Sequence, residues 1–243
     1  MAIAQFLEEE RVSVTMAILA VIFVVSAVGV AFAGMMMTFS ALIMGQVPVA
    51  SIGVTAFTLV FGIISGILQV IVLYQWSKVM NQNITNTERV FQSIKERLED
   101  PLRGEIGFFL SRVEEFRVIT WPFWIYVVTY IIGLFTGMYA LLFYLIGFIF
   151  VAVYLSSIFK SANKLSDLKD KIYRYLQEKK HMMIEGEVYR IKRYNIIVFI
   201  ILSIITFAIY WLYVLVKLSV EINRYVETDE TIRARIEQAF LQP

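Results

Sequence analysis

The sequence predicts an all-α, polytopic membrane protein, and three observations indicate this fold class. Hydrophobic residues make up 59% of the 243 residues, whereas soluble domains contain about 45–50% apolar residues. The 22 basic and 20 acidic residues all lie outside three long stretches, residues 12–77, 118–159 and 194–216. These stretches are apolar on every side, which is typical of membrane helices, because the strands of a membrane barrel alternate apolar and polar residues.

The first stretch has room for two helices, since one crossing of a bilayer needs about 20 apolar residues. Proline and glycine cluster over residues 45–53, so we expect the break there. The first crossing then covers residues 12–34, with an extension toward 35–37, and the second covers residues 55–76. Three glutamates, at 8–10, precede the first crossing where a cleavable signal peptide would carry positive charge, so we interpret this helix as a permanent span.

The second stretch has room for two crossings only if a tight turn joins them, and the glycines within residues 133–137 mark that corner. The third stretch supplies 23 residues, about 35 Å of helix, which fits one crossing of a ~30 Å hydrocarbon core. We therefore expect about five transmembrane helices, in two hairpins plus one. The predicted regions are an N-terminal tail and first hairpin (1–77), cytoplasmic amphipathic helices (78–117), a second hairpin (118–159), a basic cytoplasmic amphipathic helix (160–193), a last transmembrane segment (194–216) and a C-terminal amphipathic helix (217–243).

Orientation follows from lysine and arginine, which favour the cytoplasmic side. Residues 78–117 carry seven basic and seven acidic side chains, residues 160–193 carry ten basic and five acidic ones, and the hairpin corners carry none. Both charged segments and the N-terminus are therefore predicted to be cytoplasmic, in a protein of the plasma membrane. With a single crossing at 194–216, the C-terminal tail lies outside. The aromatic cluster near Lys217 favours that crossing, because Trp and Tyr prefer membrane interfaces.

An internal repeat leaves a second topology open. When Asn81, Asn163 and Asn223 are aligned, three apolar helix ends that run into polar helices come into register. If this reflects duplication, the unit is a membrane helix that continues into an amphipathic helix on one side of the bilayer. All three tails would then be cytoplasmic, and residues 194–216 would be a re-entrant hairpin bent near Thr206. The single crossing is our preferred prediction.

Thr206–Tyr210 and Tyr213 also carry a resemblance. The segment 201–223 resembles a family of uncharacterised small multi-spanning membrane proteins with a T-x-G-I-Y-x-x-Y-W segment, which implies membrane residence. Ala208 replaces the glycine of that pattern and Val214 its final tryptophan. The loss of the glycine disfavours a turn at this point.

Apolar side chains at helical spacing run along the polar segments. Such a stripe must be buried against another stripe, against lipid headgroups or against another subunit. We predict a partner-facing stripe made of Leu165, Leu168, Ile172, Leu176, Ile232, Ile236 and Phe240.

The predicted spans contain no ionisable Asp, Glu, Lys, Arg or His, which disfavours ion-coupled transport. Gln69 needs a partner within the membrane, because a mid-span amide cannot bond to hydrocarbon. The chain has no cysteine and one histidine, His181. It contains no Walker loop, G-x-S-x-G, H-E-x-x-H or dinucleotide-binding motif. We therefore predict no catalytic residues, no cofactor and no metal site. The candidate polar contacts inside the membrane are Thr58, Ser65, Gln69 and Thr206.

These features favour a non-catalytic membrane subunit or scaffold, which associates with a partner or with itself through its membrane helices and amphipathic helices. The alternative is a passive oligomeric pore, lined by hydroxyl and amide groups such as those of Thr58, Ser65 and Gln69. A lipid-modifying enzyme is a third hypothesis, which would need several carboxylates in a pocket at the membrane surface. The expected partners are membrane lipids and either further copies of the chain or a larger membrane complex, without nucleic acid.

Overall fold

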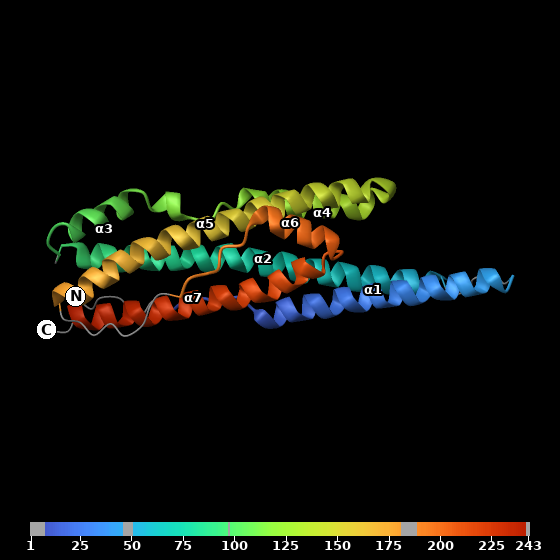
Figure 1. The fold of residues 1–243 in the computed structure, drawn as a ribbon, viewed down its shortest axis with the longest axis horizontal. Helices are drawn as coiled ribbons and strands as arrows, with labels where there is room; N and C mark the ends of the chain where they lie inside the picture. The colour runs from blue at the N-terminus through green and yellow to red at the C-terminus, as the bar shows by residue number, and fades with distance from the viewer. Residues whose placement is uncertain (1–7, 46–50, 97, 181–188, 242–243) are drawn as a thin grey trace.

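The computed structural model describes residues 8–45, 51–96, 98–180 and 189–241. Every described element is helical, as predicted, and the helices form three hairpins that lie side by side (Figure 1). The first hairpin is α1–α2, the second α4–α5 and the third α6–α7. The elements are α1 (Val14–Ile43), α2 (Ser51–Lys95), α3 (Leu102–Ser111), η1 (Val113–Phe116), α4 (Trp121–Phe135), η2 (Gly137–Tyr139), α5 (Ala140–Lys180), α6 (Ile196–Ile205) and α7 (Ile209–Leu241).

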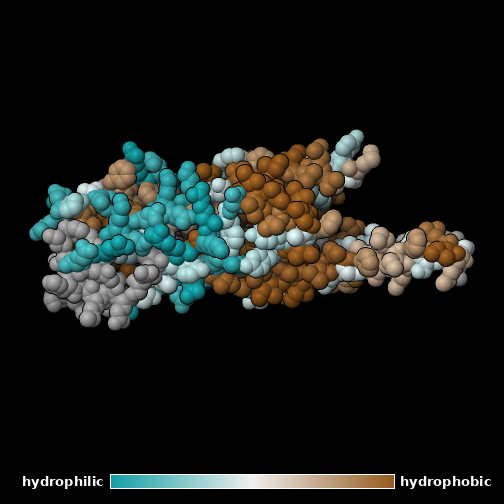
Figure 2. Space-filling model, in the orientation of Figure 1, coloured by the Kyte–Doolittle hydropathy of each residue, from teal (hydrophilic) through white to brown (hydrophobic). Residues whose placement is uncertain are grey.

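The first arms of the hairpins become shorter along the chain. Helices α1, α4 and α6 contain 30, 15 and 10 residues, which correspond to about 45, 22 and 15 Å. Within the described part of the chain, the three helices α1, α2 and α5 are long and apolar enough to cross a membrane, which indicates membrane association. Figure 2 shows a hydrophobic surface over the half of the molecule that contains α1, α4 and α6, and a hydrophilic surface over the other half.

Helix α1 begins where the hydroxyl of Ser13 accepts a hydrogen bond from the backbone N–H of Met16, which satisfies one of the free donors of the first turn. It runs on through the three methionines at 35–37. Its contact with α2 is close at Gly34, where an added Cβ would lie 2.3 Å from a side-chain carbon of Val54. The predicted break over residues 45–53 falls largely on 46–50, which lie outside the described residues.

The chain reverses direction between α4 and α5 within the predicted corner. Helix α4 ends at Phe135, and Gly137 adopts a φ of +54° before η2 leads into α5. Such a backbone conformation is readily available to glycine.

The expectation of one crossing helix over residues 194–216 is wrong. This stretch forms two helices, because the chain turns back at 206–208 and α7 runs toward the same end of the molecule as α2 and α5 (Figure 1). Phe207 and Ala208 adopt φ values of 49° and 69°, so the turn forms without the glycine whose absence spoke against it. The C-terminal helix therefore ends at the same end of the molecule as the charged segments, and not at the opposite end as a single crossing would require.

Local hydrogen bonds explain this turn. The backbone N–H groups of residues 206–209 donate to backbone carbonyls within 202–206. The Thr206 hydroxyl donates to the Leu202 carbonyl and accepts from the Tyr210 N–H, at 2.7 and 3.0 Å. Every N–H from 206 to 210 is thus bonded inside the turn, which removes the main cost of placing a reversal in hydrocarbon.

The second arms α2, α5 and α7 are continuous through the predicted region boundaries at 77, 159 and 216. Their polar ends lie together as a three-helix bundle in which the helices run parallel (Figure 1). The aligned positions of the repeat are buried in the same order along the three helices. Two of the resulting layers are Trp76 with Ile158 and Leu218, and Ile94 with Leu176 and Ile236.

The described residues of the predicted partner-facing stripe are buried in this bundle. Its side chains are buried inside the chain itself at Leu165, Ile172, Leu176, Ile232 and Ile236, and Leu168 is half-buried against them. They are therefore not available to a partner, because α2, α5 and α7 bury their apolar stripes against one another. The side chain of Phe240 lies outside the described residues.

Candidate functional site

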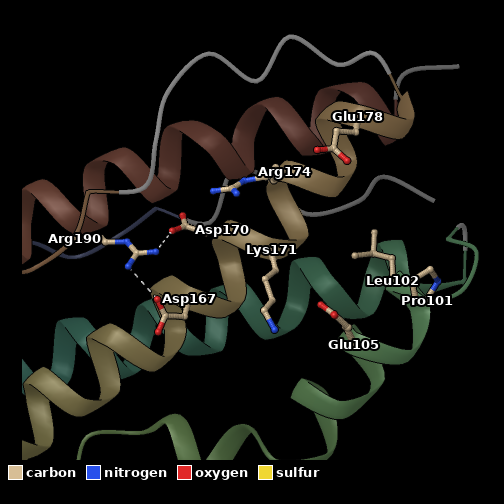
Figure 3. A pocket seen from close by; sticks show the side chains of 9 residues that line it. All are labelled: Pro101, Leu102, Glu105, Asp167, Asp170, Lys171, Arg174, Glu178 and Arg190. Carbon is tan, nitrogen blue, oxygen red and sulfur yellow. Dashed lines mark hydrogen bonds and ion pairs between the residues drawn. The ribbon is translucent and has the colours of Figure 1, made fainter.

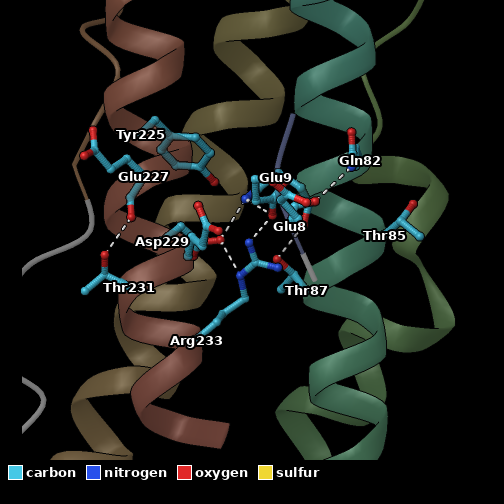
Figure 4. A network of polar contacts seen from close by, with 12 residues as sticks. Glu8, Glu9, Gln82, Thr85, Thr87, Tyr225, Glu227, Asp229, Thr231 and Arg233 are labelled. Atoms are coloured by element: carbon cyan, nitrogen blue, oxygen red, sulfur yellow. Dashed lines mark hydrogen bonds and ion pairs between the residues drawn. The ribbon is translucent and has the colours of Figure 1, made fainter. Parts of the chain in front are cut away.

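One layer of the three-helix bundle is polar, although it lies between apolar layers. Six residues beyond the aligned asparagines, the three helices contribute Thr87, Lys169 and Asp229, and all three side chains are fully buried. The Lys169 Nζ lies 2.8 Å from the Asp229 Oδ2. This layer is the centre of the buried ion network, which Figure 4 shows from close by.

The N-terminal segment before α1 completes the buried ion network. It places Glu9 between α2 and α7, where the carboxylate pairs with the guanidinium of Arg233. The Arg233 Nε also lies 2.9 Å from the Asp229 Oδ2. Figure 4 shows Arg233 pointing from α7 toward Glu9. Residues more than 200 positions apart are thereby joined in one cluster.

Asn83 connects the opposite charges. Its amide nitrogen donates to Asp229 at 2.8 Å and to Glu9 at 3.1 Å, and its oxygen accepts from Lys169 at 2.9 Å. The Tyr173 hydroxyl donates to the other carboxylate oxygen of Asp229 at 3.1 Å. Because buried charges are tolerated only when they are paired and hydrogen-bonded, these contacts offset the cost of burying the charged groups.

At Asp229 the neighbouring charges oppose the effect of burial. Burial by itself would raise the pKa of Asp229, but the charges of Lys169 and Arg233 outweigh it and hold that pKa below its ordinary value. The carboxyl groups of Glu9 and Asp229 face the basic groups of Lys169 and Arg233 in a buried site. Each charged side chain is paired with another protein group, an arrangement typical of buried polar residues that fix the register of packed helices.

The sequence analysis did not predict this network, because it used charge only to separate membrane segments from polar segments. A signal was present in the aligned repeat. The two residues occupy one position of the repeat, three residues before the apolar position of Ile172 and Ile232. A lysine and an aspartate at equivalent core positions of two packed helices indicate a buried pair.

A surface cleft of about 650 Å³ lies between α3 and α5. Arg190, from the segment before α6, points into it and bonds to Asp170 and, at 3.1 Å, to Asp167 (Figure 3). The rest of the lining mixes both signs of charge, so no single ligand charge is favoured. The lining residues are Pro101, Leu102, Glu105, Asp167, Asp170, Lys171, Arg174, Glu178 and Arg190.

Three of the four residues predicted to make polar contacts inside the membrane form hydrogen bonds within the chain. The Ser65 hydroxyl donates to the Ala20 carbonyl at 2.8 Å and accepts from the Gln69 amide nitrogen at 3.1 Å. The Gln69 oxygen accepts from the Trp211 indole at 2.8 Å, which links α2 to α7. Thr206 closes the turn described above. The Thr58 hydroxyl is buried and has no hydrogen-bond partner among the described residues.

His181 falls outside the described residues. No protein-family model, curated protein or solved structure matches the chain. The geometry of the chain therefore carries the functional argument.

Proposed function

We propose that the chain is a non-catalytic membrane scaffold, which holds a rigid three-helix bundle at the cytoplasmic face of the plasma membrane. It joins a second membrane subunit, either another copy or a different protein, through its first hairpin. The observation that carries the proposal is the reach of that hairpin, which extends beyond the other two (Figures 1 and 2).

The projecting part of the first hairpin is apolar and open. Met35, Phe39 and Leu42 are 62%, 61% and 64% exposed. Helix α1 also presents Gly29 and Ala33 on its exposed surface, and a Cβ added at Gly29 would meet no atom within 4 Å. Two small residues four positions apart allow a second membrane helix to approach closely.

The buried ion network supports the scaffold part of the proposal. It joins Glu9 before α1 to Asn83, Lys169 and Asp229 on the three second arms, so the bundle holds one arrangement. The basic segments and both ends of the described chain lie at this end of the molecule (Figure 1). The excess of lysine and arginine supports a cytoplasmic position for it.

Two earlier hypotheses lose support. The amphipathic stripes are buried within the chain, so association through them is not part of the proposal. A passive pore would need several free hydroxyl and amide groups, but Ser65 and Gln69 bond to each other and to neighbouring helices. Of the three lining residues predicted for a pore, only Thr58 has a hydroxyl without a hydrogen-bond partner among the described residues.

The test is the oligomeric state of the full chain after extraction in a mild detergent. Light scattering on wild type should show a stable companion or a homo-oligomer. The double variant Gly29→Leu, Ala33→Leu should be monomeric, because larger side chains hold the second helix away. Ala56→Leu, at an exposed position of α2, is the matched control and should associate as wild type does.

Monomeric wild type would contradict the proposal if single-molecule photobleaching in bilayers also counts one chain per spot. Association that survives the double variant would move the contact away from α1.

A further inference from the structure

The chain enters the membrane half of the molecule three times, once before each hairpin. At the first entry, the Val12 N–H donates to the side-chain oxygen of Asn223 at 2.7 Å. At the second, the Val118 N–H donates to the side-chain oxygen of Asn81 at 2.8 Å. In both cases the segment that leads into a hairpin is hydrogen-bonded to an aligned asparagine on the second arm of a different hairpin.

A further bond closes each of these two entries. The Ser13 N–H donates to the Gln75 side chain at 2.9 Å, and the Ile119 N–H donates to the Ser157 hydroxyl at 2.7 Å. Gln75 and Ser157 occupy the same position of the repeat, six residues before the aligned asparagine.

The third entry, before α6, is built differently. The third aligned asparagine, Asn163, donates to the Phe159 carbonyl of its own helix at 2.7 Å. The repeat position of Gln75 and Ser157 is taken by Lys217, whose Nζ lies 5.8 Å from the centre of the Tyr194 ring. Between α5 and the start of α6 the structure has an open cleft of about 750 Å³.

The lining of this entry cleft combines basic and apolar side chains. Lys160, Lys164 and Arg193 are exposed along it, and its acidic member, Asp167, is paired with Arg190. The full lining is Ser156, Phe159, Lys160, Asn163, Lys164, Asp167, Arg193, Tyr194, Asn195, Ile196 and Ile197.

The entry cleft lies where the charged residues give way to the uncharged stretches, a position that corresponds to the boundary between lipid headgroups and hydrocarbon. Ile196 is the first residue of α6 and lies in the cleft. Arg193 precedes the 23-residue uncharged stretch, and Lys160 follows the apolar part of α5. A group that fits this place carries negative charge on one side and hydrocarbon on the other.

We propose that the entry cleft binds the phosphate of an anionic membrane phospholipid. Lys160, Lys164 and Arg193 contact the headgroup oxygens, since basic side chains next to a membrane attract anionic lipid. Phe159, Ile196 and Ile197 pack against the start of the acyl chains. The lipid fills the third entry, where the asparagine contact of the other two entries is not made.

The test uses the full chain in nanodiscs of phosphatidylcholine with 20 mol% phosphatidylglycerol, followed by native mass spectrometry. Wild type should retain one phosphatidylglycerol in preference to phosphatidylcholine. The triple variant Lys160→Gln, Lys164→Gln, Arg193→Gln should lose this preference by about tenfold or more. These side chains are exposed, and unchanged thermal melting in detergent shows that the variant is folded.

The matched control removes the same charge elsewhere, with Arg89→Gln, Lys171→Gln and Arg174→Gln, which are also exposed. It should retain phosphatidylglycerol as wild type does. Equal losses in both triple variants would overturn the proposal in favour of general attraction by net charge. Full retention by the first triple variant would overturn it as well.

Free phosphate shares the chemistry of the headgroup, so a second arm separates the two sources. Calorimetry with inorganic phosphate, on protein in neutral detergent, should show no saturable binding at millimolar concentration. Saturable binding that the first triple variant abolishes, without selection of phosphatidylglycerol, would assign the entry cleft to a soluble anion and overturn the lipid proposal.

Discussion

The repeat is regular in the polar half of the molecule and varies in length in the apolar half. In the polar half, α2, α5 and α7 bury matching positions in matching order, and the three helices are nearly equivalent. In the apolar half, the first arms contain 30, 15 and 10 residues, and the hairpins end at different depths (Figure 1).

The difference shows what constrains each half. A three-helix bundle in water must fill its interior layer by layer, so each helix keeps the same spacing of buried positions. A hairpin surrounded by lipid needs only an apolar surface and bonded backbone groups. Its length is therefore free to vary, and the third hairpin ends at a turn that satisfies its own N–H groups.

The largest expected effect breaks the polar half. Asp229→Ala leaves Lys169 and Arg233 buried without their shared carboxylate, which should lower the free energy of unfolding by about 3–5 kcal/mol. Denaturant unfolding of the protein in detergent measures this loss. The exposed neighbour Glu227 supplies the control, and Glu227→Ala should change stability by less than about 0.5 kcal/mol.

Replacing the pair Lys169→Met and Asp229→Leu together sharpens the same test. It should recover part of the loss, because two apolar groups leave no unpaired charge between these helices. A single variant Asp229→Ala as stable as wild type would show that the buried ion network does not hold the bundle.

A smaller effect tests how the apolar half is joined. Gln69→Leu leaves the Trp211 indole N–H without its acceptor and should cost about 1–3 kcal/mol. Thr58→Val is the control, because the Thr58 hydroxyl has no hydrogen-bond partner among the described residues. Thermal unfolding in detergent compares the two, and equal melting temperatures would contradict the Gln69 contact.

The smallest effect concerns the turn of the third hairpin. Ala208 adopts a φ of 69°, a conformation that costs a non-glycine residue roughly 1–2 kcal/mol. Ala208→Gly should relieve this strain, but glycine also has more conformational freedom in the unfolded chain, which offsets part of the gain. The expected net stabilisation is therefore about 0.5–1 kcal/mol. The opposite sign is expected for Ala31→Gly inside α1, which should lose about 1 kcal/mol. A loss at both positions would argue for one continuous helix over residues 194–216.

Part of the site was accessible from sequence. Ser65 and Gln69 were singled out as polar contacts inside the membrane, and they bond to each other and to α1 and α7. The ion network was not found, because charge was used only to separate membrane from water. A lysine is read as solvated until its surroundings are known, and those of Lys169 come from residues at 9, 83 and 229.

The turn at 206–208 shows a second limit. Its glycine signal is missing, so composition favoured one crossing. The reversal is stabilised by the Thr206 hydroxyl and by aromatic rings that come together only when the helices pack. The ring centre of Phe199 in α6 lies 5.5 Å from that of Phe148 in α5 and 6.0 Å from that of Trp211 in α7. No local sequence pattern predicts these two ring contacts, because they join different helices.

The sequence by itself determined that the chain is helical and suited to a membrane, because three stretches without charge can satisfy their backbone in lipid only as helices. It also contained the register of the repeat, through the aligned asparagines at 81, 163 and 223. Only the tertiary structure decided that the last stretch turns back and that Lys169 and Asp229 meet inside the bundle. Both depend on contacts between distant segments, and the energy of such contacts is set by packing and burial, which no single stretch of sequence specifies.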